Sequence, residues 1–582
     1  MYGLRFYFVV IALSGCAQLP APQKPAIEKD SFTYARTQLT WLINKAIKEE
    51  NIAGLSIALV ANDQSVWQQG FGYANKATHE KVNPQTLFRA GSLAKVFIAL
   101  AVLELHQQGQ LDIDAPIINY LPEFTKSHSD ASAITLRQLL SHQSGLPSDL
   151  IKGMWTNQPT HYTSSLGYLK NTTFPHPPEQ LVLYSNLGFN LIAAVVEART
   201  QTPAIDYMNA FLQRLNMHNS AYSASPIFPP TAQSYHKGRK KKELPLRDVP
   251  AAGLSTNVAD LAQFYQQLLS ANVSGLNTNN LNQMFIDHSS SLPLNFGKRV
   301  GLGMFYYDGI FHPKFPLFGH NGATVNHRSV IKFSRDGRYG VALLSNDRAA
   351  APALHRIANT ALALLHEAST GRPAPHYSLR WPKPSPADVL EPQKILGHYA
   401  SPLGLIKISQ KNQTLHASIG GKRLRLYQRE NNGLYYLRYR LFGLFPIDLG
   451  YIGNLGFALQ VVDNHSYLIA HTTYGTRERI GIKLSSHNIP KAWQERVGHY
   501  EVVNPLTAMK LYSGGIKLED GFLVAYARTE QGDKLQVVLK PINDYEAEVT
   551  GIGRGLGERV RVLNTSLEEQ LIYSNILFEK KK

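Results

Sequence analysis

Two proline clusters divide the chain into parts with different hydrophobic periods. Residues 371–375 (Gly-Arg-Pro-Ala-Pro) and 381–386 (Trp-Pro-Lys-Pro-Ser-Pro) interrupt regular backbone hydrogen bonding. Before them, apolar residues recur every three or four positions in several segments, for example from Leu39 to Ile47. After them the period becomes two, as in 423–426 (Arg-Leu-Arg-Leu), and helical patterns vanish. We therefore predict a linker over residues 371–390, followed by a β-rich region.

Strands are expected at both ends of the region before the linker. Residues 55–61 and 65–71 predict one hairpin, and residues 328–333 and 339–344 predict another. Helical patterns lie between them, after Ser92, Asn186 and Asn257, and a last helix is expected over residues 352–367. Because the first and last strands can pair, residues 32–370 are expected to form an α/β (α+β) layered domain with an antiparallel sheet.

The β-rich region contains a short repeat. Gly397-His-Tyr399 recurs as Gly498-His-Tyr500, and short strand patterns follow each copy. This predicts two small antiparallel β-barrel domains, over residues 391–486 and 487–582. The glycine-rich run 551–557 (Gly-Ile-Gly-Arg-Gly-Leu-Gly) misses the dinucleotide-binding spacing, so we interpret it as turns.

The first residues resemble a bacterial lipoprotein signal. Arg5 precedes an apolar stretch over residues 6–13 that is too short to span a bilayer, and Leu13-Ser-Gly-Cys16 resembles a lipobox. Cys16 is the only cysteine, so residues 1–15 are expected to be a signal peptide and residues 16–31 a tether from a lipidated Cys16. An ordinary signal peptide is the alternative. Ala17 then implies the outer membrane, facing the periplasm.

The formal net charge is +17, which first suggests nucleic acid as a partner. An exported chain would not meet nucleic acid, and most of the charge is dispersed, so no nucleic-acid partner is expected. The exception is residues 237–242 (Lys-Gly-Arg-Lys-Lys-Lys), which we interpret as an exposed loop. A basic surface suits anionic lipid or cell-wall polymer.

Ser92 and Lys95 form a Ser-x-x-Lys pair where a helix is expected to begin. A serine is a poor nucleophile and needs an adjacent base, and a lysine three residues later lies on the same helix face. Two surface residues would give the same pattern, so further motifs must support a catalytic interpretation. Ser92 in the first helical turn would also lie near free backbone N–H groups.

Two further motifs complete the constellation. In Tyr184-Ser-Asn186, the tyrosine could relay the serine proton, with phenolate character favoured by Lys95, and Asn186 could hold a substrate carbonyl and the lysine. In 319–323 (Gly-His-Asn-Gly-Ala), Gly322 would let a substrate backbone approach an edge strand. The N–H of Ala323, with that of Ser92, could form an oxyanion hole.

Together these motifs resemble the penicillin-recognising serine hydrolases: class C β-lactamases, D-alanyl-D-alanine carboxypeptidases, D-aminopeptidases and related esterases. The resemblance covers about residues 32–368 and includes residues 139–147 and 251–256. It implies a β-lactamase-like domain with a helical subdomain, Ser92 as nucleophile, Lys95 and Tyr184 as an acid/base pair, and Asn186 as a positioning residue. The D-aminopeptidases of this family also carry two C-terminal barrels, which are lipocalin-like. His142, inside residues 139–147, is expected to be structural.

One position departs from the family. Lactamases and carboxypeptidases carry Lys-Thr-Gly, or a close relative, where this chain has His320, Asn321 and Gly322. A histidine is mostly neutral at pH 7, which weakens the case for strict carboxylate recognition and for efficient β-lactam turnover. The His-x-Gly pattern is closer to D-aminopeptidases and esterases.

No cofactor is expected, because one cysteine excludes cysteine-type zinc sites and no His-Glu-x-x-His occurs. We therefore predict an envelope serine hydrolase that acts on small peptides or amides with D-residues, on peptidoglycan-derived pieces, or on esters, with possible weak β-lactam binding. The alternatives are a carboxylesterase without a cell-wall role and a binding or scaffold lipoprotein on the same fold. The barrels could border the cleft or bind wall material.

Overall fold

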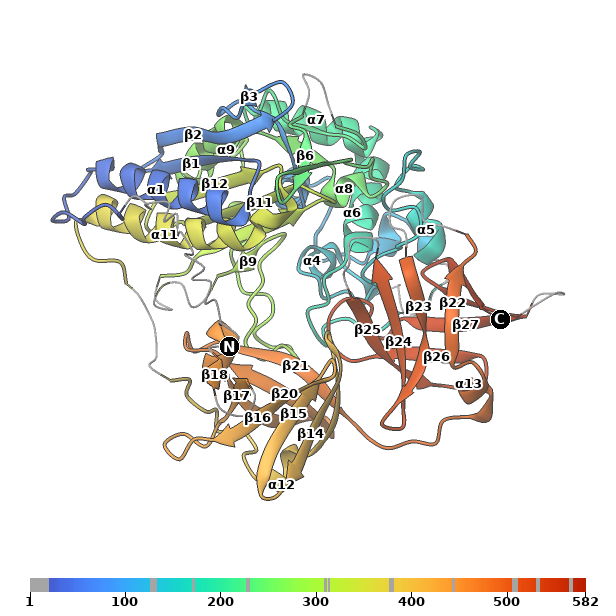
Figure 1. The fold of residues 1–582 in the computed structure, drawn as a ribbon. Helices are drawn as coiled ribbons and strands as arrows, with labels where there is room; N and C mark the ends of the chain where they lie inside the picture. The colour runs from blue at the N-terminus through green and yellow to red at the C-terminus, as the bar shows by residue number, and fades with distance from the viewer. Residues whose placement is uncertain are drawn as a thin grey trace, which may run out of the picture.

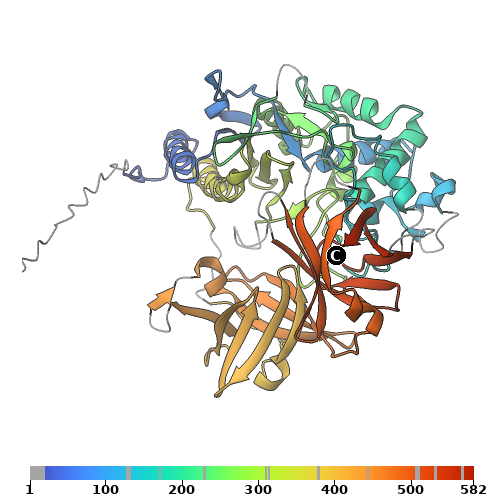
Figure 2. The same ribbon diagram turned by 45° about the vertical axis from the view of Figure 1, so that its right-hand side comes forward.

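The computed structural model divides the chain into three packed bodies: a mixed helix-and-sheet domain followed by two barrels (Figures 1 and 2). It describes residues 20–581 except 126–132, 170–171, 173, 227–230, 308–310, 312–314, 376–380, 442–444, 448, 505–510, 530–533 and 565–568. Residues 1–15 and Cys16, expected to form the signal peptide and the lipidation site, lie outside the described residues. Within the described part, no helix is both long enough and apolar enough to cross a lipid bilayer.

The first domain is built on an antiparallel seven-stranded sheet. Its order is β3-β2-β1-β12-β11-β10-β9, so the first strand pairs with the last long one, and Leu55 lies opposite Ser345. This confirms the expected pairing of the two ends of the region. The strands are β1 (Gly54–Ala61), β2 (Gln64–Asn75), β3 (Glu80–Lys81), β9 (Phe305–Tyr306), β10 (Phe318–Ala323), β11 (Arg328–Ser334) and β12 (Tyr339–Ser345).

Helices cover both faces of this sheet. On one face lie α1 (Thr33–Glu50) and α11 (Ala351–Thr370), which pack against each other and whose buried apolar residues share a cluster with those of β1 and β12 (Figure 1). On the other face lies α9 (Val258–Leu269), in contact with β1, β2 and β12. The sheet is therefore the middle layer of three.

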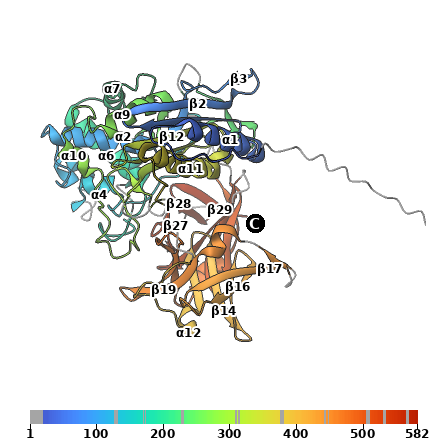
Figure 3. The same ribbon diagram turned by 90° about the vertical axis from the view of Figure 1, so that its left-hand side faces the viewer.

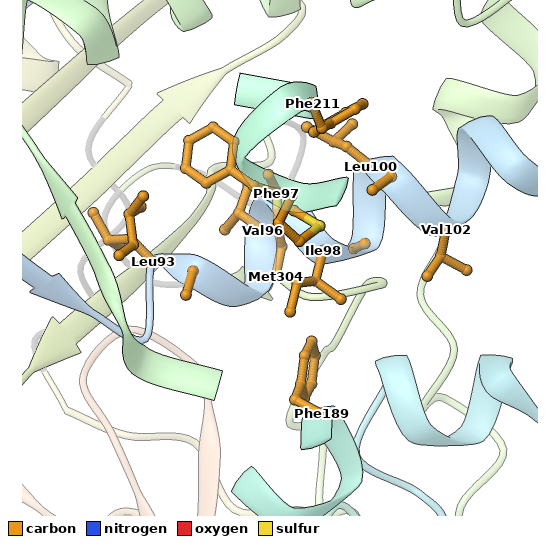
Figure 4. Packing of buried hydrophobic residues seen from close by; sticks show 14 of the residues in the cluster. Leu93, Val96, Phe97, Ile98, Leu100, Val102, Phe189, Phe211 and Met304 are labelled. Atoms are coloured by element: carbon orange, nitrogen blue, oxygen red, sulfur yellow. The ribbon is translucent and has the colours of Figure 1, made fainter. Parts of the chain in front are cut away.

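A helical region extends from the second face. At its centre, α2 (Ala94–Gln107) is buried from Ala94 to Leu105 and packs against Phe189, Phe211 and Met304 (Figure 4). An all-round apolar helix of this kind is fixed from every side. The remaining elements are η1 (Ile117–Asn119), α3 (Pro122–Thr125), α4 (Leu136–Leu140), α5 (Ser164–Leu169), α6 (Asn186–Thr200), α7 (Ala204–Arg214), α8 (Val249–Ala252), α10 (Thr278–Gln283), η3 (Arg348–Ala350), β4 (Phe88–Gly91), β5 (Ala221–Tyr222), β6 (Ser234–His236), β7 (Arg239–Lys241) and β8 (Leu254–Thr256).

The first barrel is a ring of eight antiparallel strands closed by pairing of β16 with β17. The short strand β18 pairs antiparallel with the end of β17. Its elements are α12 (Pro392–Ile395), β13 (Gly397–Ser401), β14 (Gly404–Lys411), β15 (Thr414–Ile419), β16 (Lys422–Gln428), β17 (Tyr435–Leu441), β18 (Phe445–Ile447), η4 (Gly450–Asn454), β19 (Gly456–Val462), β20 (His465–His471) and β21 (Arg477–Leu484).

The second barrel is closed by pairing of its first and last strands, β22 and β29. Its elements are α13 (Lys491–Glu495), β22 (Gly498–Val502), β23 (Leu511–Glu519), β24 (Phe522–Thr529), β25 (Lys534–Pro541), β26 (Glu546–Thr550), β27 (Arg559–Asn564), β28 (Glu569–Tyr573) and β29 (Ile576–Lys580). The prediction of two antiparallel barrels is thus confirmed. The expectation that helices vanish was wrong, because α12 and α13 precede the two barrels.

The sequence repeat has a structural counterpart. Each Gly-His-Tyr opens the first strand of a barrel, and each tyrosine hydroxyl donates a hydrogen bond to the carbonyl four residues earlier. The distances are 2.6 Å from Tyr399 to Ile395 and 2.9 Å from Tyr500 to Arg496. Each repeat therefore ties the short helix to the strand that follows it.

Both barrels pack against the same side of the first domain (Figure 3). An apolar cluster joins all three bodies: Leu183 and Phe296 from the first domain, Tyr467 and Ile469 from the first barrel, and Leu556 from the second. The two barrels also share a cluster of their own, which contains Ala400, Leu405, Phe522, Val524 and Val538. Apolar burial of this kind fixes the three bodies relative to one another.

Candidate active site

All three bodies contribute walls to one cleft of about 1120 Å³. The first domain lines it with Ser92, Tyr184 and His320, whereas the barrels contribute residues 476–479 and 552–554. Of the two roles foreseen for the barrels, bordering the cleft is therefore the one that the structure displays.

Ser92 lies in a turn between β4 and α2 and lines the cleft. The helix begins at Ala94, so the expected position of Ser92 in the first helical turn was wrong by two residues. The turn remains tight, because the N–H of Lys95 donates to the Ser92 carbonyl at 3.1 Å. Since α2 is buried along its length, the positions of Ser92 and Lys95 are set by the core.

Lys95 is completely buried, and its amine faces three oxygen atoms. Its Nζ lies 2.7 Å from Asn186 Oδ1, 2.7 Å from the Ala251 carbonyl oxygen and 3.3 Å from Ser92 Oγ. Burial lowers the pKa of Lys95 well below its ordinary value, and the positive charge of Arg554 lowers it further. In this arrangement Lys95 Nζ donates to the oxygen atoms of Asn186, Ala251 and Ser92. A neutral amine that kept its two N–H groups on the two carbonyl oxygens would have its one lone pair left for the Ser92 hydroxyl.

Tyr184 lies beside this pair, but its protonation differs from the expectation. Burial raises the pKa of Tyr184 to about 12, although its hydrogen bond with Ser92 lowers it. The expected phenolate character was therefore wrong, because desolvation of the half-buried ring outweighs the nearby charges. Tyr184 is a neutral phenol that can donate a proton. The Lys95 Nζ lies 4.9 Å from its ring centroid.

Asn186 connects Lys95 to the second barrel. Ser185 caps α6 by accepting from the Gly188 N–H at 3.0 Å, which places Asn186 at the first helical position. While Asn186 Oδ1 accepts from Lys95, its Nδ2 donates to Asp149 Oδ1 at 2.7 Å. Asp149 in turn pairs with Arg554 of the second barrel, Nε to Oδ2 at 3.1 Å. The amide orientation of Asn186 is thus fixed from both ends.

His320 lies on β10, lines the same cleft as Ser92, and is only 2% exposed. Its Nδ1 is 2.6 Å from the Asn321 carbonyl oxygen, and its ring centroid is 6.2 Å from that of Tyr184. Burial, with a contribution from the charge of Lys95, lowers the pKa of His320 to about 3. The imidazole is therefore neutral at pH 7, as the sequence predicted.

Gly322 has a packing role that the sequence did not show. A Cβ on Gly322 would lie 1.9 Å from the Ala90 carbonyl oxygen and 2.3 Å from Ser329 Oγ. Its missing side chain therefore lets β10 approach β4 inside the protein, and the expected approach of a substrate backbone to this strand stays a prediction. Ala323, next to it, is exposed and lines the cleft with Ser92.

Three contacts at the site were not found from the sequence. The Ala251 carbonyl, Asp149 and Arg554 all bear on Lys95 or Asn186, although none belongs to the Ser-x-x-Lys, Tyr-x-Asn or His-x-Gly motif. Residues 251–256 had been matched to the family, which gave a signal for Ala251 but no role. His142 instead accepts the Ser185 N–H at 3.2 Å through Nδ1 and so supports the Tyr184 segment.

The buried sheet, the helical region and a serine paired with a desolvated lysine are the features of an α/β domain of the serine hydrolase type. The Beta-lactamase family matches residues 39–365, more than half of the chain. The chain therefore belongs to the β-lactamase family, in which β-lactamase-related and penicillin-binding proteins are grouped.

Two curated relatives show the extent of the sequence similarity. Protein flp of Staphylococcus aureus strain MRSA252 is 24% identical to this chain, over 54% of this chain and 63% of its own length. A putative penicillin-binding protein PbpX of Bacillus subtilis is 25% identical over 58% of this chain and 81% of its own length. This chain thus covers less than two thirds of the flp protein.

Solved structures share the fold. SurE with D-Leu matches with a TM-score of 0.54 and 22% identity over 76% of this chain and 98% of its own. An octameric penicillin-binding protein homologue from Pyrococcus abyssi matches with a TM-score of 0.51 and 20% identity over 76% and 99%.

Proposed function

We propose that this protein is a serine hydrolase that forms an acyl-enzyme on Ser92 and then hydrolyses it. The supporting observation is the environment of Lys95. A buried amine that donates to two carbonyl oxygens and faces the Ser92 hydroxyl at 3.3 Å is a base prepared for proton abstraction. Membership of the β-lactamase family agrees with this type of reaction.

In acylation, Ser92 Oγ bonds to the substrate carbonyl carbon while its proton passes to the Lys95 amine. The carbonyl oxygen takes the electron pair, and the N–H groups of Ser92 and Ala323 are our candidates for stabilising it. Loss of one such donor typically costs about 3–4 kcal/mol. The bond to the leaving group then breaks, and the leaving atom takes the proton of the Tyr184 hydroxyl, which Lys95 replenishes.

Deacylation repeats these steps with water as the nucleophile. Lys95 and Tyr184 accept the water proton and return it to Ser92 Oγ as the acyl bond breaks. Asn186, held by Asp149, keeps the lysine oriented through both halves.

We propose small peptides or amides with D-residues, peptidoglycan-derived pieces or esters as substrates, and β-lactams as slow substrates or inhibitors. The cleft favours small molecules because both barrels narrow it. A carboxylesterase without a cell-wall role uses the same residues, so the leaving group distinguishes the two. A pure binding protein would have no need for the desolvated Lys95.

The test is the intact mass of wild type and Ser92→Ala after incubation with a fluorophosphonate and with a penicillin. We expect an adduct on wild type and none on Ser92→Ala. The absence of any wild-type adduct would refute the enzymatic function. D-amino-acid p-nitroanilides are then compared with p-nitrophenyl esters, and turnover of esters alone would favour the esterase.

We also propose that the protein is exported and anchored through a lipid on Cys16, at the outer membrane facing the periplasm, where cell-wall material is a possible partner. The lipobox-like sequence before Cys16 supports this. Labelling with a clickable palmitate analogue in a didermal bacterium should mark wild type, whereas Cys16→Ala should stay unlabelled. Equal labelling of both would refute the anchor.

A further inference from the structure

The glycine-rich run of the second barrel forms one wall of the active site. Residues 551–557 connect β26 to β27, and Ile552, Gly553 and Arg554 line the cleft. Gly553 and Gly555 flank the arginine with φ of 96° and 80°, conformations that suit glycine. Their backbone turns carry the Arg554 side chain out of the barrel and over the site.

Arg554 lies directly against the catalytic group Tyr184. Its guanidinium carbon is 5.0 Å from the Tyr184 ring centroid, and its side chain is 54% exposed. It pairs with Asp149 at 3.1 Å and 3.3 Å, so both acidic oxygens hold the planar group in one orientation. The exposed remainder of the guanidinium is open to the cleft.

The support beneath this pair is rigid. Arg247 donates to the carbonyl oxygens of Leu150 and Lys152 at 2.7 Å each. From the other side, Ser574 of the second barrel accepts the Ile151 N–H at 2.7 Å. Asp149 is therefore held in place, and Arg554 is oriented before any ligand binds.

The His-x-Gly motif offers no cation that could compete with Arg554 for an anionic group. His320 is neutral and buried, and Lys95 is occupied with Ser92, Asn186 and Ala251. Over the whole cleft, seven basic side chains face two acidic ones, which favours an anionic substrate. The basic residues are Lys298, Arg299, Arg328, Arg348, Arg477, Arg479 and Arg554, and the acidic ones are Asp149 and Glu478.

The position of Arg554 identifies the part of the substrate that it faces. In the proposed reaction, the leaving atom takes its proton from Tyr184 and so must lie beside that hydroxyl. A group attached to the leaving atom then extends toward the guanidinium over the tyrosine ring. An arginine fork is well suited to a carboxylate, which it can bind through two hydrogen bonds.

We propose that Arg554 is a specificity-determining residue that binds a carboxylate on the leaving group of the substrate. This inference rests on the proposed function of Ser92. It gives the second barrel a direct part in substrate selection, and it assigns the anion site to a loop outside the β-lactamase domain. Substrates with a free acid next to the scissile bond are thereby preferred over their neutral analogues.

The test uses two esters with the same acyl group: the phenylacetyl esters of 4-hydroxybenzoic acid and of 4-hydroxybenzamide. Wild type should favour the acid by about tenfold or more in kcat/KM, the range of a charge-assisted hydrogen bond. Arg554→Ala should bring the ratio to about one. The ratio is the readout, because losing Arg554 also removes its pairing with Asp149 and its charge near Lys95, and so changes the rates of both esters together. Arg554→Lys should retain part of the preference.

The matched control is Arg559→Ala, which removes an arginine from the same barrel. Arg559 pairs with Glu546 and does not line the cleft, so the ratio should stay at the wild-type value. A wild-type ratio near one would overturn the inference, as would an Arg554→Ala variant that keeps the wild-type ratio. Fluorophosphonate labelling distinguishes failure of the carboxylate site from failure of the proposed function. If wild type is labelled but its ratio is one, only the carboxylate site is contradicted. If wild type is not labelled, the proposed function is refuted, and this inference with it.

Discussion

We predict that Glu558 makes the docking of the second barrel dependent on pH. The side chain is 5% exposed, and its Oε1 accepts the Ser148 N–H of the first domain at 3.3 Å. Burial raises the pKa of Glu558 to about 7 from an ordinary 4.5, the nearby Asp149 adds to this rise, and a hydrogen bond from Tyr573 opposes it. The protonated acid is therefore the form that the interface prefers.

The sign follows from linkage. The pKa of Glu558 is higher in the folded protein than in the unfolded chain. Its contribution to the free energy of unfolding is therefore complete below about pH 4.5 and is lost as the pH rises through about 7. A shift of this size corresponds to on the order of 3 kcal/mol between the two limits. Glu558→Gln imitates the neutral acid and keeps a carbonyl oxygen for Ser148, so its stability should not fall in this range.

The assay is urea unfolding of the full chain from pH 4.5 to pH 8.5, for wild type, Glu558→Gln and the control Glu548→Gln. Near pH 4.5 wild type and Glu558→Gln should match. By pH 8.5 Glu558→Gln should be the more stable by up to about 3 kcal/mol, because wild type must then keep a buried carboxylate. Glu548, on β26 of the same barrel, is half-buried, so its variant should follow wild type. Parallel pH profiles for wild type and Glu558→Gln would refute the reasoning.

Three further predictions concern the site and its support. Leu556→Ala should lower the free energy of unfolding by about 2–4 kcal/mol, because Leu556 is buried in the apolar cluster that joins the three bodies. The same variant should release the second barrel faster on proteolysis, and unchanged proteolysis would contradict this. Tyr184→Phe should slow D-amino-acid p-nitroanilides far more than p-nitrophenyl esters in steady-state assays, because a poor leaving group needs the phenol proton, and equal slowing would exclude the acid role. Gly322→Ala should reduce the fluorophosphonate labelling rate about tenfold or more, because the new Cβ meets the Ala90 carbonyl and displaces β10. In the control Gly167→Ala the new Cβ meets nothing within 4 Å, so this variant should be labelled at the wild-type rate.

Much of the architecture could be predicted from local patterns. The two hairpins and the change of period at residue 371 led to the sheet and the barrels, because strand alternation and turn residues are short-range signals. The repeated Gly-His-Tyr was informative for the same reason: each copy makes the same bond to a carbonyl four residues earlier.

The misses have a common physical origin. The protonation of Tyr184 depends on how deeply its ring is buried, and the role of Gly322 depends on which strand packs above it; neither is encoded nearby. Arg554 was passed over as part of a turn, because its proximity to Tyr184 is created by the docking of a separate domain. A single sequence does not reveal such docking.

The cleft with walls from three bodies also has a consequence for biogenesis. A chain is synthesised from its N-terminus, so Ser92 and Lys95 emerge long before the loop that carries Arg554. Until the second barrel has folded and docked, Asp149 lacks its guanidinium partner and the cleft stands open on one side. The proposed selectivity for carboxylates would therefore be acquired only when the second barrel has folded and docked.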